Sequence, residues 1–447
     1  MAVFHADLAA RSVPRYTSYP TAAEFTETVG AVEHRTALDA LRPSDRISLY
    51  LHIPYCHEIC WYCGCNTGPV GRASRLDVYV DALVAEIDMI ADRAKGSVSH
   101  VHFGGGSPNA LSPEQFERVA TAVRNGFRIL PDAEWAAELD PRHLDADFCR
   151  MLAANNVSRV SLGAQTFDLG IQAKINRLQP FRMVARCVED LRRAGIAHIN
   201  LDLMYGLPGQ TLDTIARTIR LARDLAPDRV AMFGYAHLPR MLPRQRMIAD
   251  SQLPDAEARF WQSILARDLW LEEGFRPIGF DHYARPDDKL ALAAASGTLR
   301  RNFQGFTDDD ADAVIGLGAS SISLFPGLIT QTEKHVGRYR MKVQNGCLGT
   351  VRGVRRSADD QRSGAVIERL LCDGRVDLVE LGWSSAAAAQ AMADAAPGLA
   401  AMQERGLIRR HDTGLMILPD GEPYARLAAV AFDTFRTAAG DRFSKAV

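Results

Sequence analysis

Short apolar runs alternate with amphipathic segments along residues 46–275 of the chain. The apolar runs are rich in β-branched and aromatic residues, and the segments between them repeat apolar positions three and four residues apart. This pattern predicts six strands, at 46–54, 100–106, 135–141, 159–165, 198–206 and 229–238. It predicts helices at 76–94, 112–127, 181–194, 211–225 and 255–273. Strands that alternate with helices form parallel sheets, so an α/β fold is expected.

Each predicted strand is followed by glycine or polar residues. CHEICWYCGCN (56–66) follows the first strand, and GGGSP (104–108) ends the second. The third strand ends at Glu138 and Asp140, and the later strands end at Gln165, Asp202 and Tyr235-Ala236-His237. Such a sheet can close into a partial barrel or stay open, and in both cases the carboxyl ends of the strands form the working edge. The sequence therefore predicts one shared site at that edge.

The pattern loosens after residue 275. Segments 281–290, 299–307 and 314–323 are predicted to be loop-rich and to cap the sheet. From residue 346 the composition becomes helical and alanine-rich, as in SSAAAAQAMADAAPGLAAM (384–402), which indicates a separate, mainly helical C-terminal domain.

Composition narrows the class of partner. The net charge of the 447 residues is −2, so no global basic field recruits nucleic acid, and an anionic partner must be held by local cations. No apolar stretch approaches the ~20 residues of a membrane span. The N-terminal segment has Asp7 and lacks the apolar core of a signal peptide. A cytoplasmic protein with reduced thiols is expected.

Four of the eight cysteines, Cys56, Cys60, Cys63 and Cys65, lie within eleven positions. A zinc site usually draws pairs of ligands from separate stretches, and no second cysteine pair exists. A thioredoxin-like redox pair needs only Cys60 and Cys63 and leaves Cys56 unexplained. An iron–sulfur cluster takes closely spaced thiolates from one loop, as Cys-x3-Cys-x2-Cys supplies. The remaining cysteines are expected to be small buried residues, namely Cys149, Cys187, Cys347 and Cys372.

The cysteine spacing after the first strand and the glycines after the second resemble the radical S-adenosylmethionine (SAM) superfamily. The resemblance implies a partial (β/α)6 barrel with one [4Fe–4S] cluster on Cys56, Cys60 and Cys63. Three protein ligands leave one iron open, and SAM would bind it through its amino and carboxylate groups. Electron transfer from the reduced cluster would then yield a 5′-deoxyadenosyl radical.

A narrower resemblance covers almost the whole chain. PRYTSYPTA (14–22), HFGGGSP (102–108), NLDLMYGLPGQT (200–211) and RRNFQGFT (300–307) are similar to segments of bacterial oxygen-independent coproporphyrinogen III oxidases. This resemblance implies oxidative decarboxylation of two propionates of coproporphyrinogen III to vinyl groups, giving protoporphyrinogen IX. It further implies two SAM molecules, a reduced flavodoxin- or ferredoxin-like electron donor, and a monomer. The expected division is an arm (1–30), a catalytic barrel with capping segments (31–345) and the C-terminal domain (346–447).

The same resemblance assigns roles to individual residues. Those matching contacts to the cluster-bound SAM are Tyr50, Gly105, Glu138 and Ile322. Those matching contacts to the second SAM are Tyr62, Gly106, Ser107, Gln165, Arg177, Asp202 and Ala236. Tyr50, Cys65 and Glu138 are predicted to be catalytic. Ser107 and Tyr62 depart from the threonine and phenylalanine common in the family, but each keeps the hydroxyl or the aromatic face.

Two relatives on the same branch remain as alternatives, a haem chaperone and a haem-degrading radical SAM methyltransferase. Cys65 and the N-terminal arm favour the oxidase over the chaperone, which usually has phenylalanine at that position and lacks the arm. Four arginines are candidates to hold the substrate's propionates, namely Arg15, Arg285, Arg300 and Arg301.

Overall fold

The structure is a computed structural model that describes residues 2–72, 74–436, 443 and 445–446. It divides into two compact units, each built from segments far apart in the sequence. The cysteine unit comprises Glu24–Asp202 and Asp309–Arg356. The terminal unit comprises Met1–Ala23, Leu203–Asp308 and Ser357–Val447. These units divide the chain at other places than the expected arm, barrel and C-terminal domain, whose boundaries stay a prediction.

Parallel strands form the centre of the cysteine unit. The strands run in the order β13, β1, β4, β5, β6 and β7, and β1 pairs in parallel with β13 and β4. Their bounds are β1 Arg46–Ile53, β4 Ser97–Gly105, β5 Arg128–Leu139, β6 Val157–Gln165, β7 His198–Tyr205 and β13 Ala313–Leu317. β1 is buried on both faces, as is typical of parallel sheets covered by helices. The predicted α/β class is confirmed.

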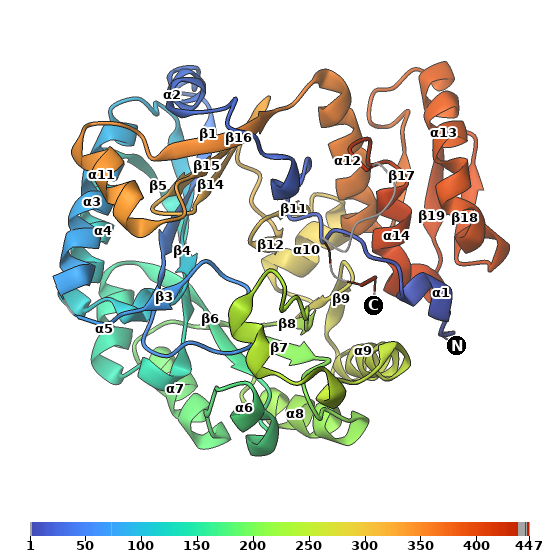
Figure 1. Cartoon of the computed structure of the whole chain (residues 1–447), viewed down its shortest axis with the longest axis horizontal. Coiled ribbons are helices and arrows are strands. Elements are labelled where there is room, and N and C mark those ends of the chain that lie inside the picture. Colours follow the sequence, from blue (N-terminus) through green and yellow to red (C-terminus); the bar gives the residue numbers. More distant parts are fainter. Residues whose placement is uncertain (1, 73, 437–442, 444, 447) are drawn as a thin grey trace. The chain divides into compact units, whose positions relative to one another are not determined.

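Helices follow the strands of the cysteine unit as the periodicity predicted. α3, α4, α5 and α7 follow one another along the outer side of these strands (Figure 1). The helices are α2 Ala31–Asp39, α3 Ser74–Ala91, α4 Pro113–Gly126, α5 Ala146–Ala154, α6 Leu169–Lys174, α7 Phe181–Arg193 and α11 Val336–Gln344. α4 begins with the predicted cap, because the Gln115 N–H donates to Ser112 Oγ and the Ser112 N–H donates back to Gln115 Oε1.

The segment at 314–323 differs from its prediction as a capping loop. Residues of β13 are buried at every position and pair in parallel with β1, so this strand lies inside the sheet. A five-residue apolar run with no helix pattern before it cannot be distinguished from other buried segments by periodicity. β14 (Ile322–Phe325), β15 (Leu328–Thr332) and β16 (Thr350–Arg355) then continue the sheet as antiparallel strands.

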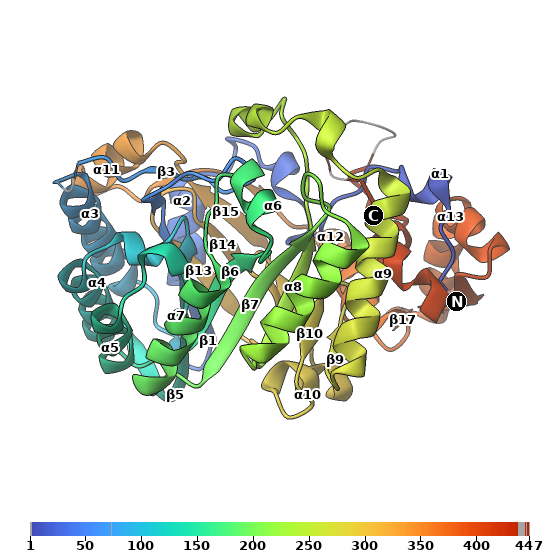
Figure 2. The ribbon, with the colours of Figure 1, turned by 90° about the horizontal axis from the view of Figure 1, so that it is seen from below.

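The terminal unit contains the last three residues of β7 followed by β8, β10 and β9, with β10 antiparallel to both neighbours. Two long helices, α8 and α9, lie side by side in this unit (Figure 2). The bounds are α8 Leu212–Asp224, β8 Arg229–Gly234, α9 Ala256–Glu272, β9 Arg276–Ile278, β10 His282–Ala284, α10 Lys289–Ser296, β11 Arg300–Asn302 and β12 Gly305–Thr307.

The C-terminal segment contains α12 (Ala358–Asp373), α13 (Ser385–Glu404) and α14 (Ala425–Val430), which confirms its helical character. It also contains a small sheet that the sequence did not predict, in the order β17 (Arg375–Asp377), β19 (Gly414–Ile417) and β18 (Ile408–His411). The hydrophobic core of the C-terminal segment includes two residues of the N-terminal arm, Leu8 and Ala9 of α1 (Ala6–Ala9), and both are fully buried. Among the described residues, no helix is long and apolar enough to cross a membrane.

Candidate active site

The cysteine loop leaves the carboxyl end of β1 and is fixed at both ends. Cys56 lies in the short strand β2 (Tyr55–Cys56), which pairs with β3 (Gly68–Pro69). Further along, the Trp61 N–H donates to the Ile175 carbonyl at 3.0 Å. Cys56 Sγ lies 3.3 Å from Thr67 Oγ1. The three predicted cluster ligands are therefore held by one loop with a defined backbone.

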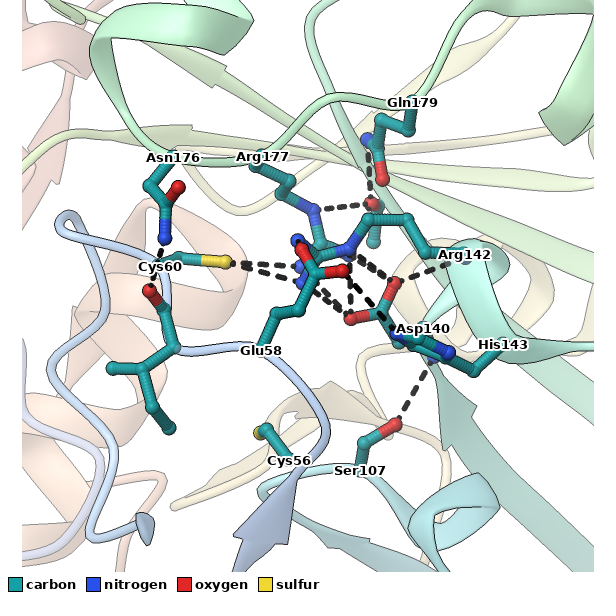
Figure 3. A network of polar contacts seen from close by, with 12 residues as sticks. Cys56, Glu58, Cys60, Ser107, Asp140, Arg142, His143, Asn176, Arg177 and Gln179 are labelled. Atoms are coloured by element: carbon teal, nitrogen blue, oxygen red, sulfur yellow. Dashed lines mark hydrogen bonds and ion pairs between the residues drawn. The ribbon is translucent and has the colours of Figure 1, made fainter. Parts of the chain in front are cut away.

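Cys60 is the most buried of the three predicted ligands and has two arginines at its sulfur. Arg177 and Arg142 donate to Cys60 Sγ at 3.3 and 3.5 Å (Figure 3). Both arginines also pair with the buried carboxylate of Asp140, at 3.3 and 2.7 Å. The two arginines therefore place positive charge at the sulfur of a predicted metal ligand.

Asp140 balances the charge of the two arginines. Burial would raise the pKa of its carboxyl, but Arg177 and Arg142 outweigh burial and lower the pKa to about 2. Arg142 also pairs with Glu58 of the cysteine loop at 2.7 Å. The network thus joins the loop to the ends of β5 and β6 through charge-assisted hydrogen bonds.

Two other thiols of the loop have raised pKa values. Burial raises the pKa of Cys56 to about 11. The neighbouring Cys63 raises the pKa of Cys65 well above its usual value, and the Cys65 N–H donates to Cys63 Sγ at 3.3 Å. Clustered thiolates repel one another, so they need bound cations to stay charged. This donor set fits an iron–sulfur cluster.

The zinc alternative finds less support in this geometry. Within the described residues, no three His, Cys, Asp or Glu side chains come together closely enough to hold a single metal ion. A cluster differs in this respect, because each cysteine binds a different iron. The wider separation of the three thiols is compatible with that arrangement.

The glycines after β4 form a cradle that a larger residue would fill. A Cβ at Gly104 would lie 2.9 Å from Glu138 Oε2, and one at Gly106 would lie 2.5 Å from the Tyr55 carbonyl oxygen. Gly105 has a φ of +107°, and a Cβ there would lie 2.7 Å from the His52 ring. Only glycine fits these positions, as the close approach of a ligand to the backbone would require.

Glu138, His102 and Tyr50 meet at this cradle. His102 Nε2 lies 2.9 Å from Glu138 Oε1, and the Tyr50 ring stacks on His102 with centroids 5.8 Å apart. Burial would raise the pKa of Glu138, but His102 and the Gly105 N–H outweigh it and hold that pKa below its usual range. An ionised carboxylate here can accept hydrogen bonds from an amino group or from hydroxyls.

His52 orients Tyr50. Its Nε2 lies 3.2 Å from the Asn66 carbonyl oxygen, which requires the proton on Nε2. Its Nδ1 then accepts from the Tyr50 hydroxyl at 3.2 Å. Burial lowers the pKa of His52, so the neutral tautomer is maintained.

The predicted contacts to a second SAM form another group in the cysteine unit. Gln165 ends β6 with a φ of 60°, a left-handed conformation that a non-glycine residue adopts rarely and that is common at functional sites. Arg177 donates to the Gly163 carbonyl at 2.8 Å as well as to Cys60. Asp202 of β7 accepts from Ser161 and Asn200 at 2.9 and 2.8 Å.

The other predicted residues have different positions. Ser107 is buried, and its hydroxyl bonds to Asn109 and accepts the Asp140 N–H. Tyr62 is half-buried on the cysteine loop, and Ile322 begins β14. Ala236 follows β8 and belongs to the terminal unit. The structure thus brings most of these residues to the carboxyl ends of neighbouring strands, while their individual roles stay predictions.

Asp140 was expected at this edge as a strand end without an assigned role, and two residues of this network were not predicted, namely Arg142 and His102. His102 and Asp140 lie at the ends of β4 and β5, so their position gave a signal, while Arg142 gave none. One cysteine prediction was wrong. Cys347 is exposed, because it follows the last turn of α11 and does not belong to a packed face, whereas Cys149, Cys187 and Cys372 are buried as expected.

Comparisons with known proteins agree with this geometry. The family model of the radical SAM superfamily matches residues 50–222. The oxygen-independent coproporphyrinogen III oxidase of Bradyrhizobium diazoefficiens is 40% identical over 437 residues, which cover 97% of each chain. The Escherichia coli protein of the same name is 36% identical over 429 residues, covering 95% of this chain and 93% of that one. A solved structure of the Escherichia coli coproporphyrinogen III oxidase has a TM-score of 0.90 at 34% identity, covering 94% of this chain and 98% of that one.

The parallel sheet, the three-cysteine loop and the glycine cradle define a radical SAM enzyme, a class whose members use a [4Fe–4S] cluster and SAM. Within that class the identities over nearly the full length are decisive. The chain belongs to the family of oxygen-independent coproporphyrinogen III oxidases.

Proposed function

We propose that the protein decarboxylates two propionate side chains of coproporphyrinogen III to vinyl groups without oxygen and so produces protoporphyrinogen IX. The observation that carries this proposal is the arrangement of Cys56, Cys60 and Cys63 beside the glycine cradle, in a chain related over its full length to enzymes of that name. Each propionate loses a hydrogen atom, carbon dioxide and one further electron, which an acceptor must take up.

The residues of the cysteine unit would have different roles in this reaction. Cys56, Cys60 and Cys63 would hold the [4Fe–4S] cluster, and Arg142 and Arg177 support Cys60 as a ligand. When bound, the cluster and SAM supply the one-electron chemistry that removes a hydrogen atom from the substrate. Glu138 accepts hydrogen bonds from the amino group or hydroxyls of a ligand beside Gly105, and Tyr50 closes the same side.

A second SAM would contact Tyr62, Gly106, Ser107, Gln165, Arg177, Asp202 and Ala236. Support comes from the left-handed backbone conformation of Gln165. Arg177 already donates to Gly163, Cys60 and Asp140, so it would have to exchange one of these contacts to bind a ligand. Equilibrium binding of radiolabelled SAM should give two sites per chain, and Gln165→Ala should reduce the count to one.

We further propose a reduced flavodoxin- or ferredoxin-like protein as the electron donor, a monomer as the working state and the cytoplasm as the location. The donor is expected because the reaction needs single electrons of low potential. Light scattering on the reconstituted protein checks the monomer, since a mass near twice 49.1 kDa would contradict it.

The reaction is tested with anaerobically reconstituted protein, SAM, a reductant and coproporphyrinogen III. Protoporphyrin after oxidation of the products, with the release of two carbon dioxide molecules for each tetrapyrrole, supports the oxidase. Tight haem binding with no turnover would indicate the chaperone instead. Transfer of a methyl group to haem with ring opening would indicate the methyltransferase.

A further inference from the structure

A small cavity in the terminal unit is lined mostly by basic side chains. It encloses about 70 Å³ between the arm, β8, α9, the turn before β10 and the C-terminal segment. The charged residues that line it are Arg15, Arg259, Arg267, Arg426, Lys445, Asp281 and Glu422. Cations therefore outnumber carboxylates among the described lining residues, although the whole chain has a net charge of −2.

The two carboxylates of the lining already have partners. Glu422 pairs with Arg267 at 2.9 Å, and Asp281 accepts from His282 Nδ1 at 2.7 Å. Burial would raise the pKa of Asp281, but nearby charges, that of Arg15 among them, lower it. One carboxylate thus compensates Arg267, and the other is shared between a histidine and the remaining cations.

Arg15 and Arg259 are held by neutral acceptors. Arg15 donates to the Gly234 carbonyl, and Arg259 donates to the Tyr235 carbonyl at 2.8 Å. These bonds fix the two guanidinium groups at adjacent residues at the end of β8. A carbonyl does not cancel a full positive charge, so both groups retain charge toward the cavity.

The basic side chains that line the cavity also act on one another. Burial together with the nearby charge of Arg15 lowers the pKa of Arg259, and the same causes lower the pKa of Arg426 to about 10. An anion bound between these groups would remove that repulsion. Arginine is well suited to this task, because its planar fork binds a carboxylate through two parallel hydrogen bonds.

The size of the cavity restricts the ligand. A volume of about 70 Å³ corresponds to roughly two water molecules, which is the space of one carboxylate with a short methylene stem. Ile264, Met232 and Phe280 supply an apolar wall for such a stem. A whole tetrapyrrole does not fit, whereas the end of one side chain does.

The other candidate arginines for the substrate have contacts of different kinds. Arg300 pairs with Glu368 at 3.0 Å, and Arg285 donates to the Pro227 carbonyl at 3.0 Å. Arg301 lies over the ring of Phe306 at 4.3 Å and donates to the Arg15 carbonyl at 3.1 Å. Arg301 therefore supports the arm at Arg15, and Arg15 is the candidate of the four that lines the cavity.

We propose that this cavity is a carboxylate-binding site in which Arg15 and Arg259 hold one propionate side chain of the tetrapyrrole substrate. The identity of the ligand rests on the proposed function, while the anion site itself rests on the cavity alone. A bound propionate would keep its carboxylate, so the site serves binding and orientation. Its occupant is a side chain that is not reacting at that moment.

The experiment measures binding of coproporphyrin III, the stable oxidised form, to the reconstituted holoenzyme by fluorescence. Arg15→Gln and Arg259→Gln keep a donor for the carbonyls but lose the charge and the fork, and each should weaken binding about 10- to 100-fold. KM for coproporphyrinogen should rise by a similar factor, while kcat, iron content and SAM binding stay unchanged. Arg220→Gln, on the exposed side of α8, is the matched control and should leave all values unchanged.

One further variant and one further ligand separate the possible outcomes. Arg259→Lys keeps the charge without the fork and should fall between wild type and Arg259→Gln, which protects the test if a glutamine variant unfolds. Wild-type affinity in both glutamine variants would overturn the proposal. If millimolar propionate binds and raises the melting temperature of the wild type but not of the variants, yet does not compete with coproporphyrin, a free carboxylate is the ligand and the propionate assignment is wrong. Absence of any turnover in the wild type would reject the proposed function. Binding that still depends on Arg15 and Arg259 would in that case support the anion site alone.

Discussion

Arginines provide the charge at two places in this protein, but their partners differ. In the cysteine unit, Arg142 and Arg177 share the carboxylate of Asp140 and both donate to the Cys60 sulfur. In the terminal unit, Arg15 and Arg259 donate to backbone carbonyls and face a cavity. An internal carboxylate cancels the charge and fixes the arginine as part of a scaffold. A carbonyl fixes the arginine equally well and leaves its charge for a ligand.

The largest effect is expected at the sulfur where both arginines of the cysteine unit meet. Cys60→Ser removes a cluster ligand, so the variant should lose its iron, its visible absorbance and all detectable turnover. Iron analysis and the anaerobic assay measure this. Cys347→Ser is the matched control, because Cys347 is an exposed cysteine in the same unit. A cluster of normal stoichiometry in Cys60→Ser would remove Cys60 from the ligand set.

Asp140→Asn tests whether charge compensation matters for the cluster. The variant leaves two buried arginines without their shared carboxylate, which should destabilise the fold by about 3–5 kcal/mol and lower activity roughly 10- to 100-fold. The pKa of Asp140 is lowered to about 2, so its contribution is fully present above about pH 4 and is lost only as the pH falls toward 2. Urea unfolding at pH 7 and the turnover assay measure both effects.

Glu134→Gln is the control for that variant. Glu134 pairs with Arg159 at 2.8 Å. It lies on β5, the strand that leads to Asp140, and it precedes Glu138 of the site by four residues. It should lose stability while activity per folded molecule is retained. Equal loss of activity in both variants would mean that Asp140 acts only through the fold.

Glu86→Gln examines a buried carboxylate that has hydrogen bonds in place of a cation. Glu86 accepts from the Gly318 N–H at 2.6 Å and from the Tyr339 hydroxyl at 2.8 Å, and burial raises its pKa to about 7. Because the folded pKa exceeds the unfolded value, this group favours the folded state most below about pH 4.5. That stability, about 3 kcal/mol, is lost as the pH rises to 7. Urea unfolding between pH 5 and 8 should show this slope in the wild type and a flatter profile in Glu86→Gln; identical slopes would contradict the assignment.

The smallest effect on the cluster is expected at Cys65. The Cys65 backbone N–H donates to Cys63 Sγ, and this bond survives in Cys65→Ser. The cluster absorbance should therefore be preserved, whereas turnover should fall by about tenfold, the value of one hydrogen bond. Loss of the absorbance would identify Cys65 as a ligand. Wild-type turnover would remove it from the catalytic residues.

The sequence predicted the parts of the fold whose periodicity is local. The strands β1 and β6 and the capped helix α4 are found where their patterns place them, because burial on one or two faces repeats along each segment. β13 was missed because it is a short apolar run whose partner, β1, lies far away in the sequence. The small sheet of β17, β18 and β19 was missed because its strands have only three or four residues.

The site shows the same limit. The cysteine spacing and the glycines are local patterns, and both predicted the carboxyl edge of the sheet. The network around Asp140 depends on Arg177, which is 37 residues away and is brought to Asp140 by the pairing of β6 with β5. Deleting residues 1–21 would be a poor test of the N-terminal arm, since Leu8 and Ala9 belong to the core of the terminal unit. Point variants of Arg15 avoid that loss.

The two donors on Cys60 also matter for how the metal centre is assembled. Arg142 and Arg177 hold this sulfur in one position, and Asp140 keeps both donors in place. A ligand that is held in position before the cluster binds loses less conformational entropy on binding. Asp140→Asn should accordingly slow cluster insertion more than it weakens a cluster already in place.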